Sequence, residues 1–351
     1  MHPETSLNLV VTVAKAANTV FQLDADKATL EAGKSGTIGI KAKAGDVTAK
    51  VKSGEDVVTL KDLNVTAVSS GTAVIEVTDS GNSAYGALTK EYTVTVTKKA
   101  ASFKLNATSA SMTYGGSTYK IGYTNNAGKV TFTSGRTSVA TVSSAGVITA
   151  KKPGNATITV KDPGNGSTKD SSLSFKVTVK KADQSVKAAF KSGSTKVGGT
   201  AKYTLTGVKT SAPTVTSNKT SVAKISSKSK TAINIKAVKA GTAKITVKVP
   251  GNTYYNAKTI TFNVKVTAAS QTIKVSPTSV SLAKKGATRQ LKVTGAKTKV
   301  TYKSSNSKIA KVDSKGKITA VKKGKCTITV TAAGTTSYSK ATKTVSVTVQ
   351  K

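Results

Sequence analysis

The chain has 351 residues and a formal net charge of +40, with one cysteine and one histidine. A single cysteine excludes an internal disulfide framework, and a single histidine excludes a histidine-based metal centre or catalytic triad. No apolar run reaches the roughly 18 residues of a transmembrane helix. Alternating runs rich in Val, Thr and Ser, with aromatics at only 5%, predict an all-β protein with thin cores.

The first expected element is the strand "SLNLVVTVAKA", residues 6–16. Leu7, Leu9, Val11 and Val13 alternate with smaller or polar residues, which predicts one face made for burial. The segment matches the closing strands found later, yet no repeat precedes it. We interpret residues 1–16 as the closing strand of an upstream module, frayed or loosely packed on the first repeat. The alternative is that it completes a sheet in a neighbouring molecule.

Four repeats follow, recognised by their closing strands. Those strands and the N-terminal one end at Val13, Val96, Val179, Val266 and Val349, with separations of 83, 83, 87 and 83 residues. This period is close to the length of a seven-stranded immunoglobulin-like sandwich. It predicts modules over residues 17–99, 100–181, 182–268 and 269–351.

Inside each repeat we expect a short strand, a hairpin, a second strand, a glycine-marked turn and a long alternating strand. The fourth copy reads "IAKVDSKGKITAVKKGKCTITV", residues 309–330, and the third copy carries four extra residues between Ile225 and Ile235. Cys326 lies two residues after the turn glycine, where the other copies have alanine. It is therefore predicted to be a buried, unreactive core residue.

A second motif, "GNSAY", "GNTYY" or "GTTSY", ends at Tyr85, Tyr255 and Tyr338, and the second copy has Thr168 there. We expect these tyrosines to be structural, with the ring on the core and the hydroxyl hydrogen-bonded nearby. A set of other tyrosines supplies the candidates for an exposed, ligand-contacting aromatic patch. These are Tyr114, Tyr119, Tyr123 and Tyr254.

The acidic residues argue against catalysis. Beyond residue 99 the chain has only Asp162, Asp170, Asp183 and Asp313. They fall singly in expected turns, so we interpret them as turn formers. Without convergent polar groups, no catalytic, cofactor or metal site is predicted, and the protein is not expected to be an enzyme.

Two segments resemble the bacterial immunoglobulin-like group 2 domain. They are "SSNSKIAKVDSKGKITAVKKGKCTITVTA", residues 304–332, and "TSVATVSSAGVITAKKPGNATITV", residues 137–160. The third copy lacks the hairpin glycine, and the first has "KDLN" in its place. The resemblance implies four tandem immunoglobulin-like β-sandwich modules in an elongated rod. It also implies a secreted, cell-surface or cell-wall protein of bacteria, with a phage virion as the alternative location.

The positive charge rises along the chain. Residues 1–99 balance to zero, and the following three ranges carry +9, +14 and +17. Outward lysines discourage edge-to-edge sheet pairing, but the near-absence of acids favours attraction to a polyanion such as an anionic cell-wall or surface polysaccharide. The basic residues include only two arginines, and no aromatic platform accompanies them, which argues against sequence-specific nucleic-acid binding.

These features together predict a non-catalytic stalk or spacer of an adhesin-like surface protein, with its basic modules near an anionic wall polymer. One alternative is an adhesin module that binds carbohydrate, host glycan or host protein directly through the tyrosine patch. The other is a structural component of a phage or filament.

Overall fold

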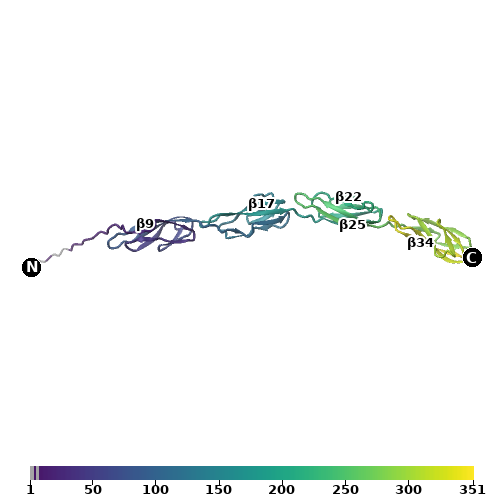
Figure 1. Cartoon of the computed structure of the whole chain (residues 1–351), viewed down its shortest axis with the longest axis horizontal. Coiled ribbons are helices and arrows are strands. Elements are labelled where there is room, and N and C mark those ends of the chain that lie inside the picture. The colour runs from purple at the N-terminus through teal and green to yellow at the C-terminus, as the bar shows by residue number, and fades with distance from the viewer. Residues whose placement is uncertain (1–3, 5–7) are drawn as a thin grey trace. The chain divides into compact units, whose positions relative to one another are not determined.

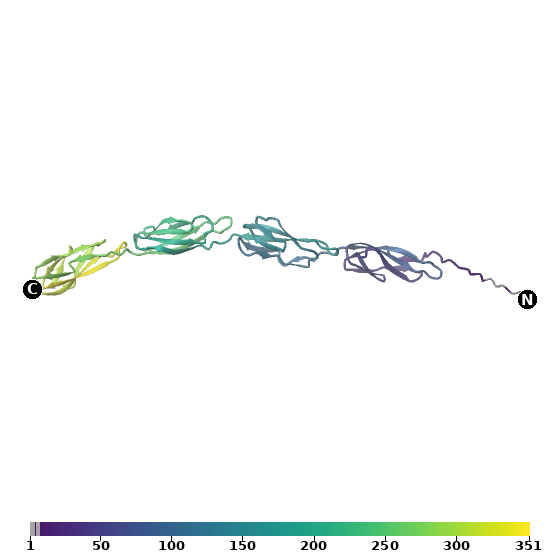
Figure 2. The ribbon, with the colours of Figure 1, turned by 180° about the vertical axis from the view of Figure 1, so that it is seen from behind.

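The computed structural model describes Glu4 and residues 8–351. Every regular element in these residues is a β-strand, which confirms the all-β prediction (Figures 1 and 2). Among the described residues there is no helix that could cross a membrane. The strands form four successive sets along the chain, called modules 1 to 4 below, and the two sheets of each set enclose a hydrophobic core.

Module 1 contains a four-stranded sheet, a three-stranded sheet and a short two-stranded pair. The sheet orders are β2-β9-β8-β5, β3-β7-β6 and β1-β4, and β2 runs parallel to β9. The strands are β1 Gln22–Leu23, β2 Lys27–Glu31, β3 Ser35–Thr37, β4 Ile40–Ala42, β5 Val47–Ser53, β6 Val58–Lys61, β7 Asn64–Ala67, β8 Gly71–Asp79 and β9 Leu88–Thr97.

Module 2 repeats this topology, with sheets β11-β18-β17-β14 and β12-β16-β15 and the pair β10-β13. Its strands are β10 Lys104–Leu105, β11 Ser109–Thr113, β12 Tyr119–Lys120, β13 Tyr123–Thr124, β14 Thr131–Ser134, β15 Ala140–Val142, β16 Val147–Ala150, β17 Gly154–Asp162 and β18 Ser171–Lys180.

Module 4 has the same arrangement, with sheets β27-β34-β33-β30 and β28-β32-β31 and the pair β26-β29. Its strands are β26 Lys274–Ser276, β27 Ser279–Leu282, β28 Thr288–Gln290, β29 Lys292–Thr294, β30 Val300–Ser304, β31 Ala310–Val312, β32 Lys317–Ala320, β33 Gly324–Ala332 and β34 Ala341–Val349.

Module 3 departs from the pattern, with sheets β21-β24-β25 and β19-β20-β23-β22. Its strands are β19 Lys187–Gly193, β20 Thr200–Thr206, β21 Thr214–Ser217, β22 Ala223–Lys228, β23 Ala232–Ala237, β24 Gly241–Val249 and β25 Lys258–Val266. The parallel strand is reduced to one bridge between Lys196 and Thr267. Ile225 pairs with Ile235 at the base of a lengthened hairpin, which is where the four extra residues were expected.

The long strand of each module organises its core. Ile75, Ile158, Ile245 and Ile328 each lie four residues after the turn glycine, and all four are fully buried. Alternate residues of β33 face inward and pair in register with β34, as period-2 patterning requires. Burying one such isoleucine contributes about 1.5–3 kcal/mol relative to exposure, so four equivalent positions anchor four separate cores.

Two features require glycine at the turn before the long strand: the backbone conformation and the lack of space for a Cβ atom. Gly324 has a φ of 146°, and a Cβ built there would lie 2.9 Å from Cδ1 of Ile309. Gly71 has a φ of 156°, and its Cβ would lie 2.8 Å from Cγ2 of Val57. The glycine therefore lets the long strand start directly against the preceding hairpin.

The four cores fall inside the four expected module ranges. By its contacts the chain divides into two compact units, residues 1–180 and 181–351. The exact module boundaries and the elongated arrangement stay predictions.

The N-terminal segment differs from the strand expected at residues 6–16. Residues 6 and 7 lie outside the described residues, and residues 8–15 form no strand. Leu9, Val11 and Val13 are 81%, 70% and 83% exposed. Alternation alone does not form a strand, because its backbone needs a partner that these residues do not meet here. The origin of the segment in an upstream module stays a prediction.

Candidate functional site

In each module, the loop that contains the tyrosine motif contacts the linker that enters the module. One residue of this incoming linker makes a parallel bridge to the last residue of the motif. The pairs are Ala16–Tyr85, Lys99–Thr168, Ala182–Tyr255 and Ala269–Tyr338. In module 4, Ala269 N donates to Ser337 O at 2.9 Å and Ser339 N donates to Ala269 O at 2.8 Å. The linker is therefore held on both sides by backbone hydrogen bonds.

The second residue of the motif shapes this loop. Asn82 Oδ1 accepts hydrogen bonds from the backbone N–H groups of Ala84 and Tyr85 at 2.8 and 3.0 Å. Thr335 Oγ1 does the same for Ser337 and Tyr338. Such Asx and Ser/Thr turns fix a loop locally. Tyr85 and Tyr338 are half-buried, so the structural interpretation of the motif rests on its backbone more than on its rings.

Buried carboxylates organise the same end of modules 1 and 2. Asp79 accepts backbone hydrogen bonds from Ala44, Gly45 and Gly81, and a fourth from the Asn18 amide. Burial of this side chain acts to raise its pKa, but the four hydrogen bonds outweigh burial and lower the pKa below its ordinary value.

Asp162 is the equivalent residue of module 2. It is fully buried as the last residue of β17 and accepts from the backbone N–H groups of Ala127, Gly128 and Gly164. Its pKa is lowered, because these hydrogen bonds outweigh the opposing effect of burial. Asp162 forms a turn through its bond from Gly164 N, two residues ahead, as expected, and the same buried side chain also holds the loop at Ala127 and Gly128, which was not expected. Asp313 is a turn former, since it accepts from Lys315 N and Lys317 N in the β31–β32 hairpin.

Modules 3 and 4 replace the carboxylate with a neutral glutamine. Val249 and Ala332 stand where Asp79 and Asp162 stand in modules 1 and 2. In module 4, Gln271 Nε2 donates to the carbonyls of Ala333 and Ser339, and Gln271 Oε1 accepts from Lys297 N. Gln184 of module 3 makes the matching contacts to Pro250, Asn256 and Lys209.

This exchange was missed by sequence reasoning, although a signal for it exists. In the aligned repeats, glutamine appears two residues after the linker residue only where the strand-end aspartate is absent. The aspartates accept only from backbone N–H groups, apart from the Asn18 amide at Asp79, whereas each glutamine accepts from one backbone N–H group and donates to two carbonyls, so both arrangements pair buried backbone groups at this end of the module.

Cys326 lies in the core of module 4, as predicted. The thiol is buried at 8% exposure and belongs to the same core as Ile328 and Val347. Its Sγ atom lies 4.0 Å from Ser304 Oγ. Its lack of reactivity stays a prediction.

The candidate ligand-contacting tyrosines of module 2 are engaged with its core. Tyr119 packs on Phe175 with ring centroids 5.5 Å apart, and Tyr123 lies 5.9 Å from Phe103. Tyr114 is half-buried against the same core. Tyr254 of module 3 is also half-buried, and its carbonyl accepts a hydrogen bond from Ala182 N. A ligand role for these four tyrosines stays a prediction.

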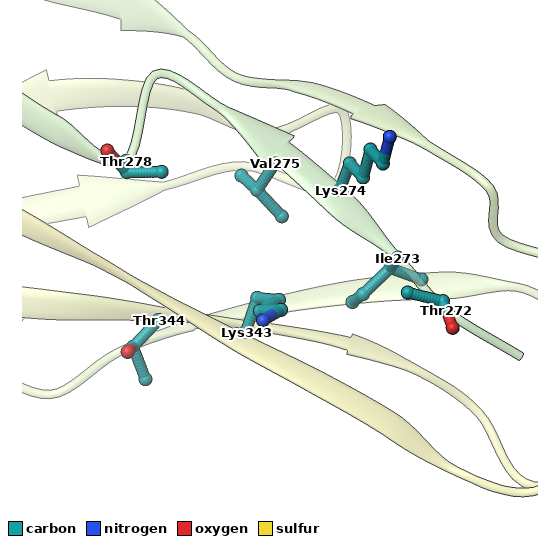
Figure 3. A pocket seen from close by; sticks show the side chains of 7 residues that line it. All are labelled: Thr272, Ile273, Lys274, Val275, Thr278, Lys343 and Thr344. Carbon is teal, nitrogen blue, oxygen red and sulfur yellow. The ribbon is translucent and has the colours of Figure 1, made fainter.

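A hollow of about 360 Å³ lies between β26 and β34 in module 4. Figure 3 shows Ile273 and Val275 turned toward it while the ammonium group of Lys274 points away. Thr272, Thr278, Lys343 and Thr344 complete the lining (Figure 3). None of the seven lining residues is an acid, a histidine or a cysteine.

A larger hollow of about 710 Å³ lies at the opposite end of module 4 from Gln271 and is lined mostly by lysine. Its residues are Lys285, Ser307, Lys308, Lys311, Val321, Lys322, Lys323 and Lys351. Lys322 and Lys323 come from the "KKGKC" stretch, whose cysteine points into the core instead. Such a site can attract anions.

Few of the lysines are neutralised by the protein itself. Of the ion pairs among the described residues, three belong to module 1, where Lys50 and Lys52 meet Glu76 and Lys52 also meets Glu91. The fourth joins Lys161 and Asp170 in module 2. In residues 182–351, all of which are described, no lysine forms an ion pair. The positive charge of modules 3 and 4 is therefore directed to solvent.

Comparison with known proteins agrees with this architecture. The strand order and paired sheets define a tandem of immunoglobulin-like β-sandwich domains. The family model for the bacterial Ig-like domain (group 2) matches residues 116–172 of module 2 and 269–349 of module 4. This confirms the resemblance inferred from the motifs. No curated protein sequence matches the chain.

Several solved structures of tandem domains are similar at low identity. Domains 1–6 of the surface layer protein SbsC match at 19% identity and a TM-score of 0.28, over 95% of this chain and 54% of that chain. The chain thus spans about half the length of that S-layer structure. The human desmocollin-1 ectodomain matches at 12% identity and a TM-score of 0.29, over 99% of this chain and 82% of that chain. Drosophila N-cadherin EC1-4 matches at 11% identity and a TM-score of 0.24, over 93% and 99%.

Proposed function

We propose that the chain is a non-catalytic stalk or spacer segment of a bacterial surface or secreted protein, with its basic C-terminal modules held near an anionic wall polymer. The family match supports a surface structural or adhesin-like protein. The four separate cores support a spacer role, because each module is stabilised by its own residues rather than by a shared functional centre.

The proposed attachment to an anionic wall polymer rests on the unpaired positive charge of modules 3 and 4. These modules carry +14 and +17 against single acids at Asp183 and Asp313, and none of their lysines forms an ion pair. A surface of this kind binds polyanions largely by releasing their counterions. Module 1, with zero net charge, supplies an internal comparison.

A pair of charge-matched variants tests the proposal. In one, exposed lysines of module 1 other than Lys50 and Lys52 are replaced by glutamine. In the other, the same number of lysines is replaced across modules 3 and 4. Binding to an immobilised glycerol-phosphate polymer should weaken strongly only in the second variant. Equal weakening in both would contradict the proposal, because the two variants have the same net charge.

A further inference from the structure

The lysine-lined hollow of module 4 is a concentrated patch of unpaired charge. Lys285, Lys308, Lys311, Lys322 and Lys323 are all exposed side chains that line one concavity. No acidic side chain of the described residues forms an ion pair with any of them. Lys351 also lines it. Five like charges gathered in one place repel one another unless an anion sits among them.

The other modules do not need this charge to form the same fold. The positions equivalent to these five lysines follow from the shared strand register and turn hydrogen bonds, such as Val321 N to Ile309 O and Val238 N to Val222 O. In module 3 they are Val197, Ser221, Lys224, Lys239 and Ala240; in module 2, Tyr114, Ser138, Thr141, Lys152 and Pro153; in module 1, Ala32, Asp56, Thr59, Ser69 and Ser70.

The number of lysines at these positions therefore rises from none to one, two and five along the chain. Since modules 1 and 2 build the same turn and strand pair without the charge, the lysines of module 4 are not explained by folding.

Resting on the function proposed above, we propose that this hollow is a discrete binding site for the phosphodiester groups of a polyol-phosphate polymer. Lysine ammonium groups are compact point charges that bind phosphate without requiring a fixed geometry. The lining has neither an arginine fork nor an aromatic ring, so the site would bind the charged backbone and ignore the polyol. Its volume of about 710 Å³ lies in the range of small-molecule sites, which allows room for more than one phosphate.

The salt dependence expected of this site follows from the number of lysines. By analogy with single-stranded nucleic acids, each neutralised phosphate contributes about −0.7 to the slope of log K against log salt concentration. Five contacts then give a slope of about −3.5, which is a loss of about 100-fold between 50 and 200 mM salt. Removal of four lysines should reduce the slope by about 3 and weaken binding about tenfold or more at low salt.

The test uses the full chain and two quadruple variants. The site variant replaces Lys308, Lys311, Lys322 and Lys323 by glutamine. The control variant replaces Lys297, Lys299, Lys340 and Lys343, which are exposed on module 4 near the Gln271 end. The probe is a defined glycerol-phosphate oligomer, titrated at several salt concentrations. Continued burial of the Cys326 thiol checks that module 4 is folded in both variants.

Loss of affinity and of salt slope in the site variant alone is the result expected. Equal, partial losses in both variants would overturn the discrete site and leave the proposed function standing. Failure of the unmodified chain to bind the oligomer would overturn both. A second measurement, acetylation of lysines with and without the oligomer, should show protection concentrated at Lys308, Lys311, Lys322 and Lys323. Uniform protection over module 4 would contradict the site.

Discussion

Replacement of Gln271 by alanine should destabilise module 4 and leave the other modules unaffected. The Gln271 amide donates to Thr298 Oγ1, Ala333 O and Ser339 O at 3.0, 3.1 and 2.8 Å, and its oxygen accepts from Lys297 N at 2.9 Å. One side chain thereby joins the incoming linker to two loops at the end of the sandwich.

The size of the effect follows from the groups left without a partner. Ala333 O keeps a hydrogen bond from Thr298 Oγ1 at 2.7 Å, whereas Lys297 N and Ser339 O lose theirs. A buried polar group left unpaired costs about 1–3 kcal/mol, with less where water can reach it. Since these groups are only partly buried, we expect a total loss of about 2–3 kcal/mol of the free energy of unfolding.

Cys326 makes this loss measurable in the full chain. It is the one cysteine of the sequence and is buried in the core of module 4, so its reaction with a thiol reagent reports on the opening of that module alone. Brief labelling at increasing urea should show a midpoint lowered by about 2 M, for a urea dependence of about 1 kcal/mol per M.

The matched control is Gln184→Ala, which removes the equivalent amide from module 3. Because the cores of modules 3 and 4 share no residue, this change should leave the Cys326 labelling curve in place. An unchanged curve in Gln271→Ala, or an equal shift in both variants, would refute the reasoning.

Three further predictions concern other parts of the chain. Cys326→Ala should cost about 1 kcal/mol or less, because it removes one small buried atom; a much lower melting temperature by circular dichroism would be inconsistent with this. Asp162 has a lowered pKa in the folded state. Its carboxylate therefore stabilises module 2 at any pH above the ordinary aspartate pKa of about 3.9, and this stabilisation is lost as the pH falls through the folded-state pKa. Hydrogen exchange should show module 2 opening in acid before module 3, which uses the neutral Gln184, and simultaneous opening would contradict the account. Deletion of residues 1–15 should leave a folded monomer by light scattering, since the described part of this segment, residues 8–15, forms no strand with module 1; if the deletion dissolves a polymer formed by the intact chain, strand addition between molecules is supported instead.

The repeated elements could be predicted from the sequence because period-2 patterning and glycine turns are local signals. The position of Cys326 followed from comparing it with the alanines of the other repeats, and burial confirmed it. The lengthened hairpin after Ile225 was likewise visible as an insertion. In these cases the information lay within a few residues of the feature itself.

Features that depend on distant partners were not predicted. Asp162 reads as a turn residue until the loop at Ala127 and Gly128 is brought onto its carboxylate. The lysine hollow joins residues from four separate segments of module 4, and only two of its lysines are adjacent in sequence. Residues 8–15 show the opposite error, because strand patterning there is present without a pairing partner.

The most direct test of the central claim is co-sedimentation of the full chain with bacterial cell walls that either keep their anionic polymer or have been stripped of it. The account predicts binding to the intact walls that falls steeply as salt is raised toward physiological strength, and little binding to the stripped walls. Equal, salt-independent binding to both preparations would contradict attachment through the charge of the basic modules.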